Sequence, residues 1–342
     1  MFKVGGADQG PLSGSLLSLA IREDTQGLYR CEASFGNWGD VGGTPGFLYF
    51  DGSTINFGKD FEVTYASDTL FKGKIFAIEA HYPEGGPPAI TVLVEDKFQD
   101  LRMKRRSRMF EDMDDSAIFQ QIAGDHGLSP TIDVSGPTHK ILSQVNQSDL
   151  AFLRERARAI DAEVWVDDSG LHAKGRAARA GTAKAMTIGN QLREFSVTAD
   201  LATQFTSVSC NGWDVAGKQA IAEEATDSAI QGELNGGKSG AGILQQAFGD
   251  RKQAVSHTVP LTSAAAQAEA AALFKRTARR FIVGHGVADP KMKVRVGDTL
   301  DLAGLGPSFN GKYYVSEARI LFDGRLGMRT EFTAERPGLG QP

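Results

Sequence analysis

The segment Gly232-Glu-Leu-Asn-Gly-Gly-Lys-Ser239 has the residue types and spacing of a phosphate-binding loop. In such a loop the glycines let backbone N–H groups surround the phosphates, the lysine reaches the terminal phosphate, and the hydroxyl binds Mg²⁺. The loop must also leave a buried strand and enter a helix. Residues 225–231, which precede it, are too polar for a central parallel strand. We therefore expect a flexible glycine-rich loop. The alternative is a nucleotide hydrolase. In such an enzyme Val164–Asp168 would be the metal-binding strand, although this segment lies before the loop and ends in a hairpin turn.

A second candidate for chemistry is a run of five cations within seven residues, namely Arg102, Lys104, Arg105, Arg106 and Arg108. Such a run could bind phosphate groups. Four carboxylates follow at once, at Glu111, Asp112, Asp114 and Asp115. Local neutralisation of the cluster is therefore the favoured interpretation.

The other chemically active side chains are scattered. No metal-binding spacing relates the six histidines, at positions 81, 126, 139, 172, 257 and 285, and Gly284-His-Gly286 is typical of a turn. Glu79, Asp96 and Asp214 could serve as glycosidase carboxylates, but nothing in the sequence brings two of them together. Cys31 and Cys210 are far apart and are interpreted as buried thiols. We expect no catalytic, cofactor-binding or metal-binding residue in this chain.

Composition indicates a globular protein that does not coat nucleic acid. The chain has 342 residues, 41% hydrophobic content and a net charge of −5. Its 40 glycines, without a collagen-like period, suit many turns between short strands. There is no apolar N-terminal segment and no run of about 18 apolar residues, so we expect synthesis in the cytoplasm and no membrane insertion.

Periodicity divides the chain into three expected regions. Residues 1–104 alternate in the manner of strands and predict a small β-barrel or sandwich. Residues 105–185 predict an α/β domain: Asp115 or Ser116 caps one helix, Ser148 caps another, and Trp165 lies in a hairpin. Residues 186–342 return to strands, interrupted by a mobile loop at about 225–255 and a helix at about 263–281. The fold class is α+β, mostly β.

The helix and hairpin of residues 143–168 resemble a segment of the phage late control protein D family, which also forms the N-terminal part of type VI secretion spike proteins. The order and spacing of further segments extend the resemblance from about Leu12 to Arg336. Those segments are Leu70–Ile78, Ile90–Asp96, Leu101–Phe110, Val208–Asp214, Gln267–Ala272, Val296–Leu300, Gly311–Val315 and Thr330–Phe332.

Three positions depart from the family pattern. Asp161 stands where the family has a glycine between the helix and the Trp165 strand, and Ile320 replaces a common histidine. Ala288-Asp-Pro290 replaces a Gly-x-Pro turn. None of these changes removes a catalytic group.

The resemblance implies the baseplate hub of a contractile tail in a phage, a tailocin or an extracellular injection particle. Such a hub is a ring-shaped homotrimer in which two tube-protein-like β-barrels per chain flank a small α/β domain and adapt a hexameric inner tube to a trimeric spike. Other baseplate proteins, and a tape-measure protein or cargo in the lumen, are further implied partners. Because this chain stops at Pro342, shortly after Thr330–Phe332, we expect the spike to be a separate protein. A hub of a non-contractile tail is the alternative within this class.

Overall fold

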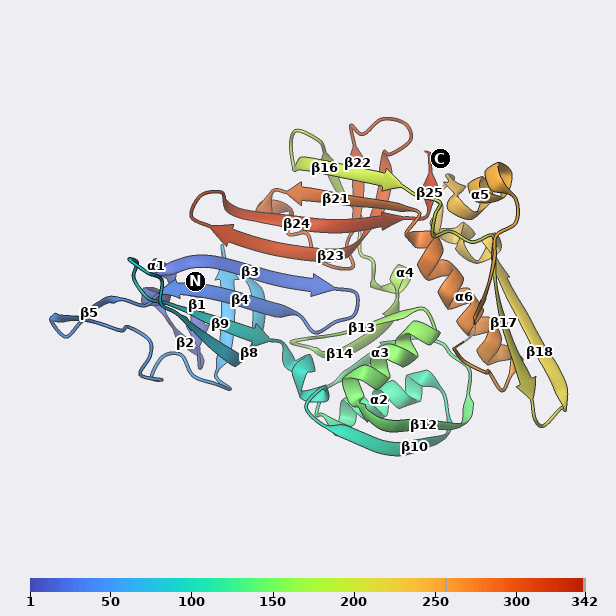
Figure 1. Cartoon of the computed structure of the whole chain (residues 1–342), viewed down its shortest axis with the longest axis horizontal. Helices are drawn as coiled ribbons and strands as arrows, with labels where there is room; N and C mark the ends of the chain where they lie inside the picture. Colours follow the sequence, from blue (N-terminus) through green and yellow to red (C-terminus); the bar gives the residue numbers. More distant parts are fainter. Residues whose placement is uncertain (256, 341–342) are drawn as a thin grey trace.

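The computed structural model describes residues 1–255 and 257–340, and its centre is a run of eight antiparallel strands. The run draws strands from both ends of the chain (Figure 1). In spatial order the strands are β16 (Leu192–Ala199), β21 (Ile282–Ala288), β24 (Gly327–Arg336), β23 (Gly311–Asp323), β3 (Leu16–Asp24), β4 (Arg30–Gly36), β9 (Ala89–Glu95) and β8 (Asp68–His81).

Shorter strands extend this sheet on either side. Beyond β8 the sheet continues through β7 (Asp60–Tyr65), β1 (Phe2–Val4) and β2 (Ala7–Asp8), and β22 (Thr299–Ala303) and β15 (Lys184–Thr187) branch from β23. The short helix α1 (Gly10–Gly14) follows β2. A two-stranded hairpin, β5 (Gly39–Val41) and β6 (Thr44–Gly46), projects from the same end of the molecule (Figure 1).

The N-terminal and C-terminal β regions are joined by the pairing of β3 with β23. Ile21 lies opposite Ile320 in this pairing, and Ile320 packs into the N-terminal core. Ile320, which stands where the resembling family has a histidine, thus adds an apolar side chain to that core. We expected two β-barrel domains that flank the α/β domain, and in the structure the strands of both β regions belong to one sheet. Each region nevertheless has its own hydrophobic core, one around Phe35 and Phe61 and one around Tyr313 and Phe332.

The middle region agrees with its expected elements. It contains β10 (Arg105–Met113), α2 (Asp115–Asp125), β11 (Pro130–Asp133), β12 (His139–Ser148), α3 (Asp149–Ala159), β13 (Ala162–Asp167) and β14 (Gly170–Gly175), preceded by the 3₁₀ helix η1 (Lys97–Leu101). The predicted cap of α3 is confirmed, because the Ser148 hydroxyl accepts the Ala151 N–H at 3.2 Å.

The predicted cap of α2 is wrong by one residue. Asp114, not Asp115 or Ser116, accepts the Ala117 N–H at 2.8 Å. The carboxylate of Asp115 is instead buried against Arg156 and His139, and these partners hold its pKa below the usual value although burial alone would raise it.

The chain leaves α3 through Asp161, whose φ is +57°. This left-handed conformation explains why the family has a glycine at this position, and aspartate is among the few other residues that tolerate it. The Asp161 carboxylate contacts Arg279, so the aspartate supplies a charge that glycine would lack.

The expected mobile loop at about 225–255 is wrong. This segment forms the end of β18 (Gln219–Thr226), the 3₁₀ helix η2 (Asp227–Glu233), β19 (Lys238–Ser239), α5 (Gly240–Phe248) and β20 (Lys252–Val255). Its apolar side chains Ile230, Leu234 and Leu244 are buried, so they hold the segment against the rest of the region.

The expected helix at about 263–281 is confirmed as α6 (Ser263–Arg279), which packs on β17 (Ser207–Asp214) and β18. The short helix α4 (Arg176–Arg179) follows β14 directly. The remaining elements are η3 (Pro290–Met292) and β25 (Gly338–Leu339). Within residues 1–255 and 257–340, no helix has both the length and the apolar character needed to span a membrane.

Candidate functional site

The segment that matches the phosphate-binding loop is built as a structural junction. The Ser239 hydroxyl accepts the Gly242 N–H at 2.9 Å and thus caps α5, and Ser239 is buried. Glu233 faces Arg279, with Nε–Oε2 and Nη2–Oε1 distances of 2.8 and 2.6 Å. A helix does follow the loop, contrary to expectation. However, β18 ends at Thr226 and η2 intervenes, so no strand leads into Gly232, and the hydroxyl that would bind Mg²⁺ is occupied as a helix cap.

The cations of the 102–108 cluster are largely paired, as expected, but with other partners than the acids that follow them. Arg106 and Arg108 contact Asp149 at 3.2 and 2.8 Å, and Arg102 pairs with the buried Glu95. The expected partners serve elsewhere. Asp112 pairs with Lys140, and Asp114 caps α2. Arg106 and Arg108 therefore fasten β10 to the start of α3, and Arg102 fastens the end of η1 to the end of β9.

The three candidate glycosidase carboxylates lie on separate elements. Glu79 is exposed on the last part of β8, Asp96 is buried at the start of η1, and Asp214 accepts backbone N–H groups in the turn after β17. The structure does not form a catalytic pair from them. Among the described residues, no group of three histidine, cysteine or acidic side chains is arranged to hold a metal ion, and Cys31 and Cys210 are buried free thiols.

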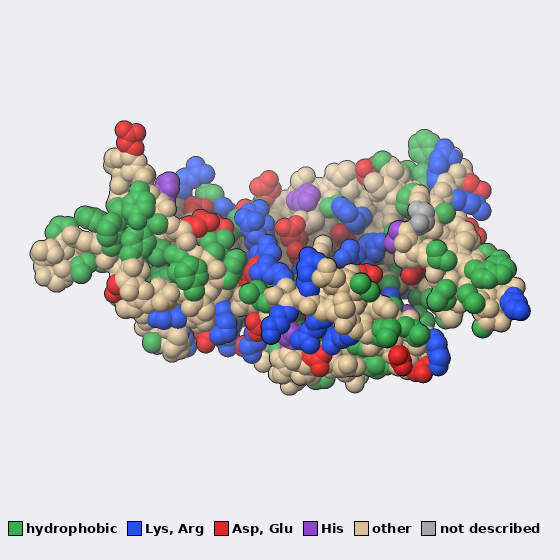
Figure 2. All heavy atoms as spheres, turned by 60° about the horizontal axis from the view of Figure 1, so that its bottom comes forward, with side chains coloured by type: hydrophobic (Ala, Val, Ile, Leu, Met, Phe, Trp, Pro, Cys, Tyr) green, Lys and Arg blue, Asp and Glu red, His purple; other side chains and the backbone are tan. Residues whose placement is uncertain are grey.

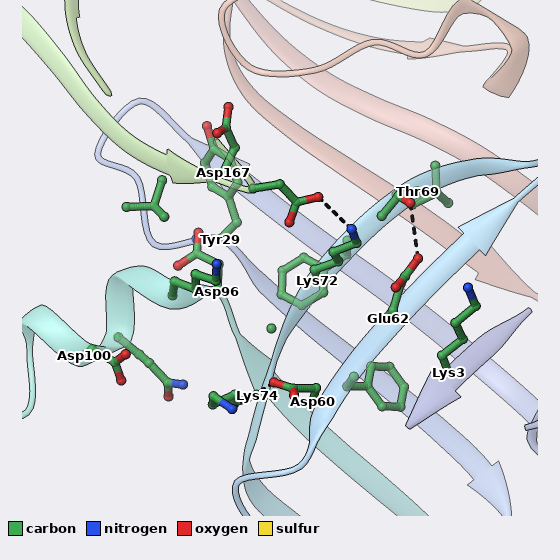
Figure 3. Close-up of a pocket in the computed structure, with 18 of the residues that line it drawn as sticks. Lys3, Tyr29, Asp60, Glu62, Thr69, Lys72, Lys74, Asp96, Asp100 and Asp167 are labelled. Atoms are coloured by element: carbon green, nitrogen blue, oxygen red, sulfur yellow. Dashed lines mark hydrogen bonds and ion pairs between the residues drawn. The ribbon is translucent and has the colours of Figure 1, made fainter. Parts of the chain in front are cut away.

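A cavity of about 480 Å³ lies where β7 and β8 of the sheet meet η1 and the hairpin of β13 and β14 (Figure 3). Ion pairs cross or border this cavity. Lys72 contacts Asp168 at 2.6 Å, Lys74 contacts Asp60 at 2.8 Å, and Thr69 donates to Glu62 at 3.3 Å. The Lys72–Asp168 pair holds the sheet to the hairpin of β13 and β14, whereas the other two contacts join β7 and β8 within the sheet.

Asp96 is the most perturbed carboxyl beside this cavity. It accepts the N–H groups of Tyr29 and Phe98 at 2.9 and 3.0 Å, while burial raises its pKa to about 7. Sequence reasoning noted Asp96 as an acid on a strand. In the structure Asp96 is a buried cap of η1 that also holds the residue just before β4.

A second junction, which sequence reasoning missed, ties the middle region to the C-terminal strands. Arg179 donates to buried Glu163 at 2.8 Å and to the Tyr29 hydroxyl at 2.7 Å. Arg176 bridges Glu163 and Glu335 at 3.2 and 2.8 Å. The sequence feature that could have indicated this junction is the spacing of Arg176 and Arg179, which are three residues apart and share one face of α4.

The exposed surfaces are the remaining candidates. An aromatic group near the β5–β6 hairpin, here called the arm patch, consists of Trp38, Val41, Phe47 and Tyr82. Each of these side chains is at least 45% exposed, and Figure 2 shows hydrophobic side chains gathered at this end. Residues 31–58 and 75–96, which include the patch, contain no lysine or arginine. Contiguous exposed apolar groups of this kind mark interaction surfaces.

Two strand edges are also open within the part of the chain that the structure describes. β16 is the outermost strand of the sheet, and apart from an isolated bridge between Leu192 and Ile188 it pairs only with β21. At the other end of the eight-strand run, β7 covers β8 only as far as Lys74, so residues 76–81 have β9 on one side and no strand on the other. Unpaired backbone N–H and C=O groups therefore lie along both edges.

Comparison with solved structures shows the same fold in tail proteins. A 43 kDa tail protein of prophage MuSo2 from Shewanella oneidensis is 14% identical, with a TM-score of 0.73 over 98% of this chain and 97% of that one. A tail protein from Neisseria meningitidis is 12% identical, with a TM-score of 0.70 over 99% and 96%. The E. coli c3393 protein, described as a type VI secretion component, is 12% identical, with a TM-score of 0.62 over 100% and 79%.

No protein with a curated description matches the sequence. A family model described as the Alg8 N-terminal domain matches residues 48–320. That match covers more than half of the chain, so the chain belongs to this family.

Proposed function

We propose that this member of the Alg8 N-terminal domain family is a structural baseplate hub of a contractile tail or injection particle. Three copies would form a ring that adapts a hexameric inner tube to a separate trimeric spike. The proposal is supported by the likeness to tail proteins along 98% and 99% of the chain, and by the resemblance to the late control protein D family.

The observation that carries the proposal is the direction of the two open strand edges. All eight strands from β16 to β8 are antiparallel to their neighbours, so the two outermost strands run in opposite directions. In a head-to-tail ring, residues 76–81 of one copy can therefore pair antiparallel with β16 of the next copy. Cyclic closure then satisfies both edges in every copy.

The number of β regions per chain suits the same role. Each chain contributes two β regions joined by β3 and β23, so three chains present six such regions to a six-fold tube. The arm patch lies beside the turn that follows His81, next to the proposed contact. Its exposed aromatic side chains would become covered when the ring forms.

Light scattering on the purified chain tests the ring. We expect a mass of three times the 36.6 kDa subunit. Adjacent backbone N–H groups in a strand point to opposite sides, so Ser196→Pro and Val197→Pro together sample both sides of β16. One variant removes an N–H bonded to β21 and should lower the melting temperature. The other should yield folded monomers. If the wild type is a stable monomer at micromolar concentration, or if both variants remain trimeric, the edge-to-edge ring is wrong.

A further inference from the structure

The surface between α3 and α6 contains more positive than negative charge. The two helices contact each other, and together with the turn at Thr25 and Gln26 they enclose a hollow of about 250 Å³. Six guanidinium groups and three carboxylates line it. The cations are Arg154, Arg158, Arg176, Arg276, Arg279 and Arg280, and the carboxylates are those of Asp161, Glu163 and Glu335.

The three carboxylates already form ion pairs, partly with arginines that line the hollow and partly with cations outside it. Asp161 contacts Arg279 at 2.8 Å and also Lys275 at 3.5 Å. Glu163 and Glu335 are bridged by Arg176, and Glu163 additionally receives Arg179. The charges of Arg176 and Arg279 are therefore compensated.

Three arginines of this set take part in no ion pair within the described residues. Within the described residues, Arg154, Arg158 and Arg276 have no carboxylate within 4.0 Å, and Arg280 is 4.0 Å from Glu335. Arg154 donates to the carbonyl oxygens of Gln26 and Gly27 at 2.7 and 2.9 Å. Burial and then the nearby charge of Arg158 lower the pKa of Arg276. These unpaired cations repel one another, which is unfavourable unless an anion binds between them.

The arginines are arranged in two rows that face a common groove. Arg154 and Arg158 are four residues apart on α3 and share a helix face, and Arg280 is the C-cap residue of α6, four residues after Arg276. Arg276 and Arg280 also line a neighbouring hollow of about 520 Å³, whose wall includes the half-buried apolar side chains of Phe205 and Val283. We call these four arginines and the two hollows the arginine groove.

We propose that the arginine groove binds an acidic peptide segment of another protein, with at least two carboxylates held by guanidinium groups from both helices. Guanidinium groups bind carboxylates through paired hydrogen bonds, and arginine is suited to sites that are partly desolvated. The apolar wall at Phe205 and Val283 fits a peptide side chain and gives no advantage to a free phosphate. Nucleic acid is a poorer match, because the chain as a whole carries a net charge of −5.

Fluorescence anisotropy with a labelled peptide that alternates glutamate and leucine tests this site in the full chain. We expect binding in the micromolar range that weakens as salt is raised from 50 to 500 mM, since screening reduces the attraction. The double variant Arg158→Gln/Arg276→Gln should bind at least ten-fold more weakly. It should keep or slightly raise the melting temperature, because it removes a repulsion.

The control double variant Lys218→Gln/Arg325→Gln removes two exposed cations outside the groove and should change the affinity less than two-fold. If both double variants lose the same affinity for the peptide, the net charge of the chain alone accounts for binding and the proposed site is wrong. Absence of peptide binding at 1 mM would also overturn it. Competition by duplex DNA at lower concentration than the peptide, or by inorganic phosphate as effectively as the peptide, would assign the groove to another ligand.

Discussion

Arg279 near the end of α6 and Asp161 at the end of α3 form an ion pair across 118 residues of sequence. Asp161 can take part because it occupies a left-handed turn where the resembling family has glycine. Arg279 is only 4% exposed, and its other face binds Glu233. One guanidinium group thus connects the middle region, the 232–239 segment and α6.

We predict that Arg279→Ala lowers the free energy of unfolding by about 2–3 kcal/mol, because it leaves the Glu233 carboxylate without its cation and the Asp161 carboxylate with only the more distant Lys275. Urea denaturation followed by circular dichroism measures the change. Lys275→Ala is the matched control, since Lys275 approaches the same carboxylate at 3.5 Å and is more exposed, and it should cost less than about 1 kcal/mol. Equal losses in the two variants would show that the pair does not connect these elements.

The cap of α2 gives a second prediction. Asp114→Ala should lower the free energy of unfolding by about 1 kcal/mol, because the Ala117 N–H loses its acceptor. Ser116→Ala should change it by less than about 0.5 kcal/mol, since the Ser116 hydroxyl contacts only the exposed Gln120 amide. Chemical denaturation of both variants decides between the two positions. If Ser116→Ala lowers the free energy of unfolding more than Asp114→Ala does, Ser116 and not Asp114 would be the cap of α2.

Sequence reasoning succeeded where the determining interactions are local. The cap at Ser148, the hairpin around Trp165 and α6 depend on residues within one or two turns of each other, and each was located correctly. The pairing of β3 with β23 places Ser18 opposite Asp323. No local sequence pattern specifies which distant strand will pair with β3. Residues 225–255 were misjudged because their few buried apolar side chains lie irregularly among glycines, and their order depends on tertiary packing.

The same distinction applies to the candidate sites. Pairing of the 102–108 cluster was anticipated, but the partner Asp149 could be identified only from the fold, because it lies at the start of α3, 41 residues after Arg108. The unpaired charge of the arginine groove was equally hidden. It results from two helices that are more than a hundred residues apart in sequence and from the prior engagement of Asp161 and Glu163.

Asp96 predicts a pH dependence of stability. Its pKa rises from an ordinary 3.8 when unfolded to about 7 when folded, so between these values the folded state holds one more proton than the unfolded state. Stability should therefore fall as pH rises from about 4 to 7, with a slope of up to ~1.4 kcal/mol per pH unit from this group. Asp96→Asn should flatten this part of the curve, although it loses one backbone acceptor. Parallel pH curves for wild type and variant would contradict the assignment.

The 232–239 segment predicts an absence of nucleotide binding. Ser239 is occupied as the cap of α5 and Glu233 as a partner of Arg279, so the segment offers no free loop for phosphates. Addition of 5 mM ATP with Mg²⁺ should shift the melting temperature by less than about 1 °C, in the wild type and in Lys238→Ala alike. A rise of several degrees that Lys238→Ala abolishes would favour a nucleotide hydrolase over the hub.

Electron microscopy of the purified full-length chain tests the hub proposal most directly. Class averages should show a three-fold ring with six β lobes around a central channel, in which β16 of each copy adjoins residues 76–81 of its neighbour. A monomeric particle without a channel, or a ring of six chains with one β region each facing the tube side, would contradict the proposed hub.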